Sequence, residues 1–388
     1  MTSVDALIVG AGPAGLNAGM RLTSVGLPLS VLLIDKVTPW ERPIPCAEGL
    51  GRLGFEEALE VDPSWIRLVI NKATFNSPDG SRVVYTDSVK RGYIIDRAKM
   101  QRDLADKLRK RGVEIALGVR AAGVSRVGGD GRRTVTFDKG EPVSARVVID
   151  ASGPVSLLGK GEDICWKPYD LEPAYFAVVD NIGCDTDTVH IYAGQSVAPG
   201  GYAWVFPRAA GVANIGVVVG RKYVKGSNLR DLLDVFLKKN FPAARVQTYF
   251  AGSIPCGYRR GNLALPGLVK CGDAASATNP ISRAGIVEAL MSGGLAGSAA
   301  VDMLSASNVK RVMRICSDYE KAWFEKRGSR HLKLAKVKDS LASVQDRDYD
   351  VAAQTLQGLS ADKLTLDKIF GTCLWRFPKL VLALRHLL

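Results

Sequence analysis

The chain has 388 residues, 47% of them hydrophobic, which is enough for a large core and two domains. Its net charge of +13 allows nucleic acid, anionic lipid or acidic proteins as partners, beside the plain alternative of solvated Lys and Arg side chains. The basic residues are spread out and no nucleic-acid-binding motif is present, so we expect no nucleic acid partner, and no apolar run of about eighteen residues predicts a spanning helix.

The N-terminal segment predicts a strand, a glycine turn, a helix and a second strand. Ala6–Val9 is an apolar run typical of a buried parallel strand, and Gly10-Ala-Gly12-Pro-Ala-Gly15 follows it directly. The second strand, Val31–Ile34, ends at Asp35. Glycines at this spacing allow a tight turn, close approach to a pyrophosphate and close packing of the helix, while the acid can bind a ribose. We therefore expect a dinucleotide site that includes Gly10, Gly12, Gly15 and Asp35.

The middle of the chain alternates between strand-like and helical patterns. Antiparallel strands are predicted between Arg67 and Tyr85, and Asp96 is expected to cap a helix that follows it. From Ile281 onward the pattern is mainly helical. The other predicted elements are a helix at Arg97–Arg111, strands within Val113–Ile149 and Tyr175–Val219, a helix at Leu229–Asn240, a strand at Leu268–Cys271, and helices at Ile281–Leu304 and Val309–Arg327.

A second set of motifs favours FAD over NAD. Lys270-Cys-Gly272-Asp273-Ala-Ala275 resembles the second fingerprint of glutathione-reductase-type flavoproteins, in which an aspartate binds the ribityl chain. Asp150-Ala-Ser-Gly153 resembles a third element, and Asp96-Arg97 resembles the helix that sends an arginine towards the cofactor. No second glycine fingerprint marks a separate nicotinamide domain.

This resemblance implies an α/β (α+β) fold of the p-hydroxybenzoate hydroxylase-like kind. It combines a glutathione-reductase-type FAD-binding Rossmann domain, an antiparallel-sheet substrate domain and a helical C-terminal region. The expected boundaries are 1–45, 90–155 and 262–305 for the FAD domain, 46–89 and 156–261 for the substrate domain, and 306–388 for the helical region.

Two further stretches resemble the geranylgeranyl reductase family, and most of all the archaeal-type digeranylgeranylglycerophospholipid reductases. They are Tyr202-Ala-Trp204-Val-Phe206-Pro207 with Asn214-Ile-Gly216, and Pro45-Cys46-Ala-Glu48-Gly-Leu50. The resemblance implies that reduced FAD saturates isolated C=C bonds of an isoprenoid chain on a lipid or a prenyl diphosphate. Carried over by motif, the residues expected to contact FAD are Ala14, Asp35, Cys46, Ala47, Gly49, Arg97, Ala121, Asp273, Gly285 and Ile286.

Candidate substrate and catalytic residues come from the same stretches. Tyr202, Trp204 and Phe206 alternate along a strand and share one face, where they line a substrate cavity or belong to the core. Cys46 is a candidate catalytic residue beside the flavin, or a small side chain packed on the ring. Glu48 holds a proton or, as we prefer, caps the helix that follows it.

The chain departs from the family pattern at two places. Ala47 replaces a loop glycine, and the glycine-rich turn before the second helix is Ser282-Arg283-Ala284-Gly285. Arg283 would add positive charge near the flavin or narrow the substrate passage. The altered turn gives weight to a non-catalytic flavin- or lipid-binding protein as an alternative function. A flavin-dependent monooxygenase or halogenase, which would share the same scaffold, is the other alternative.

The remaining expectations concern partners and location. Seven scattered cysteines without a CxxC pair predict free thiols and no metal site, and the three histidines are expected to be structural or at the surface. The electron donor is ferredoxin or NAD(P)H. The absence of a signal peptide predicts a cytoplasmic protein. The amphipathic tail Lys368–Leu388 packs on the protein or lies on the cytoplasmic face of a membrane, which would make the contact peripheral.

Overall fold

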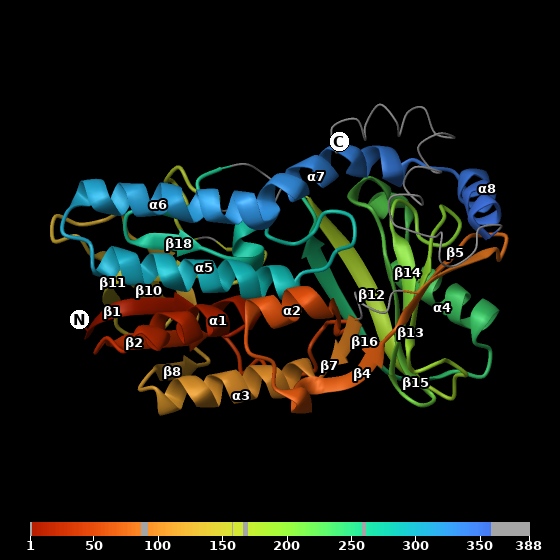
Figure 1. Cartoon of the computed structure of the whole chain (residues 1–388), viewed down its shortest axis with the longest axis horizontal. Helices are drawn as coiled ribbons and strands as arrows, with labels where there is room; N and C mark the ends of the chain where they lie inside the picture. The colour runs from red at the N-terminus through yellow and green to blue at the C-terminus, as the bar shows by residue number, and fades with distance from the viewer. Residues whose placement is uncertain (1, 87–91, 157, 166–169, 258–260, 358–388) are drawn as a thin grey trace.

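The computed structural model describes residues 2–86, 92–156, 158–165, 170–257 and 261–357. Figure 1 shows an elongated molecule with an α/β half at one end, a large sheet at the other, and the helix α7 (Ser329–Ala342) over the region where the two halves meet. This arrangement confirms the mixed α/β fold expected from the sequence.

The α/β half is built on a sheet with a parallel core in the order β18-β11-β1-β2-β8. Its central strands are buried on both faces, as Leu7, Ile8 and Ile149 have no exposed surface, which explains their uninterrupted apolar sequences. An antiparallel edge strand and a hairpin complete the sheet. The strands are β1 (Thr2–Val9), β2 (Val31–Asp35), β8 (Glu114–Leu117), β9 (Ala121–Val124), β10 (Arg133–Phe137), β11 (Val143–Asp150), β17 (Ala264–Leu265) and β18 (Leu268–Lys270).

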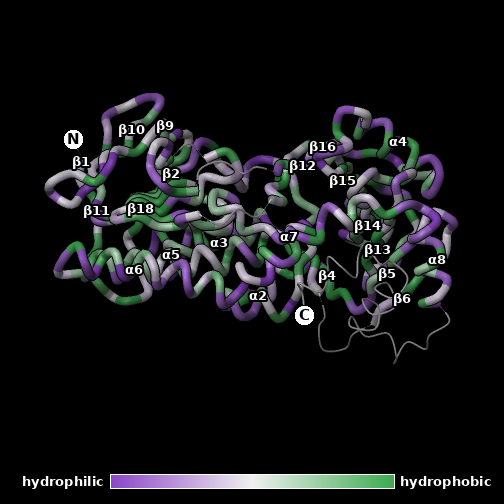
Figure 2. Tube along the Cα trace, turned by 90° about the horizontal axis from the view of Figure 1, so that it is seen from above, coloured by the Kyte–Doolittle hydropathy of each residue, from purple (hydrophilic) through white to green (hydrophobic). Residues whose placement is uncertain are grey.

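Two helices that begin beside the sheet pack against each other unusually closely. A Cβ atom added at Gly293 of α5 (Ile286–Leu304) would lie 2.1 Å from the carbonyl oxygen of Ala14 in α1 (Pro13–Leu22), so only glycine fits there. Within the part of the chain that the structure describes, α5 is also the one helix long and apolar enough to cross a membrane, and 61% of that stretch is buried. We interpret it as a core helix, which Figure 2 shows lying against the sheet.

The second half is a seven-stranded sheet in the order β16-β12-β15-β14-β13-β5-β6, antiparallel except where β13 pairs with β5. The helix α4 (Leu229–Asn240) covers one face with Leu233, Phe236 and Leu237. The opposite face is therefore left for the site. The strands are β5 (Lys72–Asn76), β6 (Arg82–Thr86), β12 (Leu171–Asp180), β13 (Thr188–Tyr192), β14 (Tyr202–Ala209), β15 (Val212–Val218) and β16 (Arg245–Pro255).

A three-stranded sheet connects the two halves. It consists of β3 (Gly49–Gly51), β7 (Gly92–Ile95) and β4 (Ile66–Ile70), and α2 (Arg52–Ala58) follows β3. The strands expected between Arg67 and Tyr85 are thus divided between this sheet and the large one. The domain boundaries expected near residues 46 and 90 fall close to this connecting sheet and stay a prediction.

The helical predictions needed two corrections. The helix expected from Ile281 begins only at Ile286, because Arg283 has a left-handed φ of 58° and Asn279 Oδ1 accepts from the amides of Ile281 and Ser282 in a turn. The helix expected over Val309–Arg327 is α6 (Val309–Trp323), which continues through the π-helical turn Phe324–Gly328 into α7.

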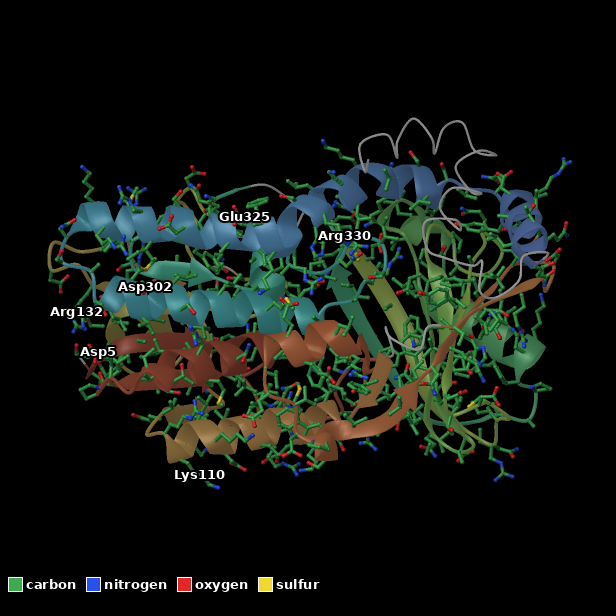
Figure 3. The ribbon with its side chains drawn as sticks, viewed as in Figure 1. Asp5, Lys110, Arg132, Asp302, Glu325 and Arg330 are labelled. Atoms are coloured by element: carbon green, nitrogen blue, oxygen red, sulfur yellow. The ribbon has the colours of Figure 1, made fainter. Side chains whose placement is uncertain are left out.

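The remaining elements are α3 (Arg97–Lys110), which Asp96 caps as expected by accepting from the Lys99 amide, and α8 (Asp346–Gln357). The tail Lys368–Leu388 lies outside the described residues. Figure 3 shows charged side chains such as Asp5, Lys110 and Arg132 at the periphery of the α/β half.

Candidate active site

The turn between β1 and α1 contains three glycines, and the physical requirement for glycine differs among the three positions. Gly10 has a φ of 111°, and a Cβ atom there would lie 2.2 Å from the Ala151 carbonyl oxygen. A Cβ atom at Gly15 would lie 1.9 Å from the Gly10 carbonyl oxygen. At Gly12 an added Cβ would meet nothing within 4 Å. Gly10 and Gly15 are therefore required by the packing of the chain, whereas Gly12 leaves the turn open to a bound group.

Asp35 holds the other side of this turn. Its Oδ2 accepts a 2.8 Å hydrogen bond from the Ala11 amide, and its Oδ1 accepts from the amide of Val37. The carboxylate lines a cavity of about 220 Å³ together with Gly10, Ala121 and Ser152. The structure thus brings together Gly10, Asp35 and Ala121, although Gly10 and Ala121 are 111 positions apart in the sequence.

A much larger cavity of about 940 Å³ lies on the other side of the glycine turn. The loop after β11 borders both cavities, with Ser152 in the small one and Ala151 and Gly153 in the large one. Of the predicted residues, only Gly15 lines neither cavity, since it packs inside the turn. Those that line the large cavity are Gly12, Ala14, Cys46, Ala47, Gly49, Arg97, Tyr202, Trp204, Phe206, Asp273, Gly285 and Ile286.

Asp273 supplies a carboxylate in the 3-10 turn Gly272–Ala275, which follows β18. Burial raises its pKa, although its Oδ1 accepts a 2.8 Å hydrogen bond from the Thr278 hydroxyl and the positive charge of Arg97 acts in the opposite direction. Arg97 itself is oriented by Gln101, whose Oε1 accepts from Nε at 2.8 Å. The acid and the cation therefore face one cavity from two different elements.

The loop before β3 places Cys46 in the same cavity. Glu48 has a left-handed φ of 62°, and its amide donates to Cys46 Sγ at 3.3 Å. Glu48 was expected to cap the helix that follows it. This was wrong, because that helix, α2, begins only after Gly51. Glu48 Oε1 instead accepts from the Arg97 amide at the start of α3, while Oε2 pairs with Arg208 at 2.9 Å. Burial, the largest influence, raises the Glu48 pKa despite these two partners.

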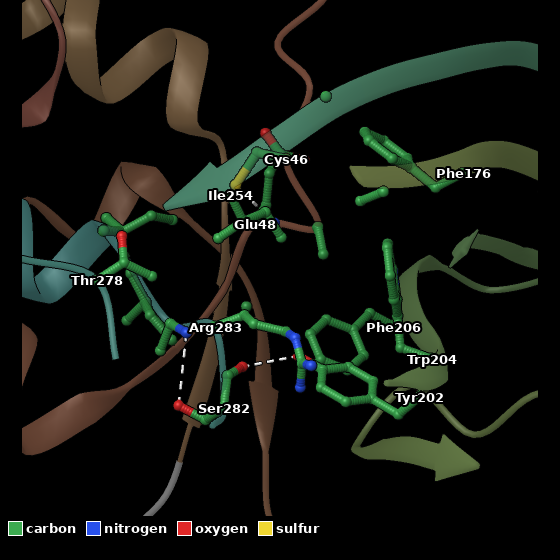
Figure 4. Close-up of a pocket in the computed structure, with 18 of the residues that line it drawn as sticks. Cys46, Glu48, Phe176, Tyr202, Trp204, Phe206, Ile254, Thr278, Ser282 and Arg283 are labelled. Carbon is green, nitrogen blue, oxygen red and sulfur yellow. Dashed lines mark hydrogen bonds between the residues drawn. The ribbon is translucent and has the colours of Figure 1, made fainter. Parts of the chain in front are cut away.

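The open face of the large sheet carries an apolar row that crosses six strands, and Figure 4 shows its members Phe176 and Trp204 at the cavity. The rings of Phe176 and Phe250 stack at 4.8 Å, and a Cβ atom at Gly216 would lie 2.3 Å from Phe176. Strand pairing puts neighbouring members of the row side by side, so they point to the same face. In strand order the row, which we call the cross-strand row, is Phe75, Ile191, Trp204, Gly216, Phe176 and Phe250.

The three aromatic residues of β14 have distinct contacts. Trp204 Nε1 donates to Asn214 Oδ1 at 2.8 Å, and Asn214 in turn donates to the Cys46 carbonyl oxygen. Phe206 both lines the cavity and packs on the Cys46 loop, since a Cβ atom at Gly49 would lie 2.7 Å from its ring. Burial raises the pKa of Tyr202 to about 12, so its hydroxyl stays protonated and donates to the Ser282 carbonyl oxygen at 2.7 Å.

A buried ion-pair cluster beside Tyr202 was not anticipated. Arg283 pairs with Glu172 at 2.7 Å, and Lys338 of α7 pairs with both Glu172 and Asp170. Only Arg283 had been singled out from the sequence. Its partners lie on β12, on α7 and in the segment before β12, and no local pattern in the sequence connects them.

Within the described ranges the histidines make structural contacts, as expected, and the cysteines form no disulfides. His190 shares a 2.8 Å hydrogen bond with Thr74, His331 is buried against Trp323, and the cysteines are free thiols. His386 lies outside those ranges. No group of His, Cys, Asp or Glu suited to a metal occurs among the residues that the structure describes.

The arrangement fits an extended flavin dinucleotide. The two cavities meet at one glycine turn, where Gly12 leaves room for a phosphate beside the N-terminus of α1. Asp35 lines the small cavity and Asp273 the large one. The first glycine turn and the distant Gly272-Asp273 segment, 257 positions after Gly15, thus converge on a single elongated site.

Comparison with known proteins agrees with this geometry. A family model for the geranylgeranyl reductase catalytic domain matches residues 170–253, and a lycopene cyclase protein model matches residues 5–169. The chain is 32% identical to a digeranylgeranylglycerophospholipid reductase of Methanosarcina acetivorans, over 99% of this chain and 96% of that protein. It is 31% identical to the protein of the same name from Methanocella arvoryzae, over 97% of each chain.

Solved structures share the fold over the whole length. A geranylgeranyl bacteriochlorophyll reductase-like protein of Thermoplasma acidophilum superposes with a TM-score of 0.89 at 25% identity, covering 100% of both chains. A flavin-dependent brominase superposes with a TM-score of 0.67 at 19% identity, over 97% of this chain and 100% of the other, and shows a common fold only. The full-length identity to the reductases, together with the catalytic-domain match, shows that this chain belongs to the geranylgeranyl reductase family of FAD-dependent oxidoreductases.

Proposed function

We propose that the protein saturates C=C bonds of a geranylgeranyl or related isoprenoid chain carried by a lipid or a prenyl diphosphate. The observation that carries the proposal is the cavity of about 940 Å³ that joins the glycine turn to the cross-strand row. A flavin site that opens on an apolar, aromatic face suits a hydrocarbon substrate, because burial of apolar surface then supplies most of the binding free energy.

Residues of the α/β half would hold the cofactor. The amides at the start of α1 and the open position at Gly12 would receive the pyrophosphate, and Asp35 and Asp273 would accept hydrogen bonds from ribose and ribityl hydroxyls. Ala14, Ala47, Gly49, Arg97, Ala121, Gly285 and Ile286 would complete the contacts. Bound FAD, once reduced, supplies the hydride that an isolated alkene requires.

Residues of the sheet half would orient the alkene and exclude water. Tyr202, Trp204 and Phe206 would hold the chain against the flavin loops, and the hydrogen bond from Trp204 to Asn214 fixes the indole ring. Saturation of a C=C bond adds a hydride to one carbon and a proton to the other. An isolated alkene has no carbonyl group to polarise, so the site needs a proton donor placed at the second carbon. The Cys46 thiol lies in this cavity and is our candidate for the group that participates there.

Anaerobic turnover tests the proposal. Purified protein, reduced with dithionite, is incubated with a geranylgeranyl-bearing phospholipid without oxygen, and the lipids are analysed by mass spectrometry. We expect products heavier by two hydrogens for each bond reduced. Oxygen-dependent hydroxylation or halogenation would support the alternative enzymes on this scaffold, and a colourless protein that takes up no FAD would support a non-catalytic binding protein.

The electron donor can be proposed only as a class of molecule. The electron donor would be ferredoxin or NAD(P)H, and the rates at which each reduces the protein would decide between them.

A peripheral contact with anionic membranes is supported by exposed Val309 and Met313 beside Lys310 and Arg314 at the start of α6. Co-sedimentation with anionic but not neutral vesicles, weakened by salt, is the expected result, and no binding to anionic vesicles at low salt would remove this proposal.

A further inference from the structure

Arg283 adopts a backbone conformation that favours glycine. Its φ is 58°, in the left-handed region, where a residue with a Cβ atom is strained. Such strain persists only where the surroundings fix the residue, and it is concentrated at functional sites. The contacts of the Arg283 side chain are therefore what offsets the strain at this position.

Those contacts hold the guanidinium group from three directions. Nε donates to Glu172 Oε2 at 2.7 Å, Nη1 donates to the Ile281 carbonyl oxygen at 2.7 Å, and Nη2 donates to the Gly200 carbonyl oxygen at 3.2 Å. The side chain is only 7% exposed. A planar group that is buried and hydrogen-bonded on three sides has little freedom to swing aside.

The ion-pair cluster also offsets the charge of Arg283. Glu172 has 1% of its side chain exposed and lies between Arg283 and Lys338, and Lys338 in turn pairs with Asp170 at 2.6 Å. Two cations and two carboxylates leave no net charge in the cluster. The influence of Arg283 on the cavity is therefore mainly that of its volume and rigidity.

Arg283 lines the large cavity and reaches from the loop before α5 to β14. Figure 4 shows its side chain extending from the loop before α5 to the ring of Tyr202, where Cζ lies 4.9 Å from the ring centroid. Cys46, Trp204 and Phe176 lie on one side of this bridge in the view. Leu341 and Ala342 of α7 line the same cavity and extend it towards the C-terminal helices.

We propose that Arg283 is a specificity-determining residue: a fixed bar, stacked on Tyr202, that limits how far an isoprenoid chain advances from the flavin loops towards α7. The bar sets the longest chain that the cavity accepts beyond the reacting bond. This inference rests on the proposed function, because it assumes that the cavity binds an isoprenoid.

The test compares chain length before and after removal of the bar. Arg283→Gly suits the left-handed backbone and clears the space beside Tyr202. Wild type and variant are compared with geranylgeranyl diphosphate and geranylfarnesyl diphosphate, which differ by one isoprene unit. We expect the ratio of kcat/KM for the longer over the shorter substrate to rise by about tenfold in the variant. Isothermal titration calorimetry of the two diphosphates with the oxidised protein supplies a readout without turnover, and the Kd ratio should shift in the same direction.

Lys338→Met is the matched control, because it removes a charge from the same cluster but leaves the bridge from Arg283 to Glu172 and Tyr202. It should keep the chain-length ratio of the wild type. Arg283→Ala replaces the glycine variant if that protein does not fold. An unchanged ratio in the Arg283 variant that folds, or an equal shift in Lys338→Met, would overturn the inference. A wild type that neither binds nor reduces either diphosphate, and also fails to reduce the geranylgeranyl-bearing phospholipid, would instead contradict the proposed function.

Discussion

Lys270 Nζ lies 2.7 Å from Asp150 Oδ2, and neither side chain has any exposed surface. The Ser156 hydroxyl donates to the same carboxylate oxygen, and Lys270 Nζ also lies 3.0 Å from Ser156 Oγ. The pair joins the ends of β11 and β18 and fixes the loop after β11, which borders both cavities. It thereby connects the stability of the sheet to the shape of the cofactor site.

Removal of one partner of this pair should be costly. Lys270→Met leaves Asp150 as an uncompensated buried charge, and we expect a loss of about 3–5 kcal/mol in the free energy of unfolding, measured by urea denaturation. The double variant Asp150→Asn/Lys270→Met removes both charges and should recover part of this loss. Equal stability of the single variant and the wild type would show that the pair contributes nothing.

The glycines of the first turn should separate folding from cofactor binding. Gly12→Ala meets no atom in the protein, so its melting temperature without FAD should match that of the wild type, while its Kd for FAD should rise by about tenfold or more. Gly10→Ala combines a left-handed φ with a clash against backbone, and should lower the melting temperature itself. An unchanged FAD affinity in Gly12→Ala, measured by fluorescence titration, would place the pyrophosphate elsewhere.

Cys46 should matter for turnover more than for binding. Cys46→Ala removes only the thiol from the large cavity, so FAD should be retained while alkene reduction falls by about a hundredfold, within the range of a lost proton donor. Cys184→Ala, which changes a half-buried cysteine that lines neither cavity, is the control and should keep normal activity. Full activity in Cys46→Ala would reduce this thiol to a packing role.

Glu48 should give the protein a particular dependence of stability on pH. Burial raises its pKa above 4.5 in the folded state, so its stabilising contribution is fully present below pH 4.5 and is lost as the pH rises through the raised value. In Glu48→Gln this loss should disappear. From acid to neutral pH, the free energy of unfolding should therefore fall less in the variant than in the wild type. Parallel stability profiles of variant and wild type between pH 4 and pH 7 would contradict the prediction.

The sequence predicted those parts of the fold that depend on local patterns. The apolar run at Ala6–Val9 and the glycines that follow it are strong signals, because a buried parallel strand and a tight turn each constrain residues that are adjacent in the chain. The edge strand β16 was missed because Arg245–Tyr249 are all exposed, so no apolar alternation marks them. The start of α5 was misplaced because the turn at Arg283 depends on tertiary contacts.

The candidate site was predictable to the extent that motifs named its residues. Cys46, Asp273 and Trp204 were singled out separately, and the structure places all three in one cavity. The cluster of Arg283, Glu172 and Lys338 could not be found in the same way, since Arg283 and Glu172 are 111 positions apart and each charge alone resembles an ordinary surface residue. Helix capping by Glu48 was anticipated, but its recipient was a helix much further along the chain.

The cross-strand row has a consequence for how a long substrate would be processed. Six of the seven strands contribute one member each, and neighbouring strands are about 4.8 Å apart, so successive members of the row are evenly spaced. A flexible hydrocarbon that moved along the row by one strand would exchange one set of apolar contacts for a similar set, at little cost in free energy. The cross-strand row would thus let a single reactive position serve several double bonds in succession, without a separate subsite for each.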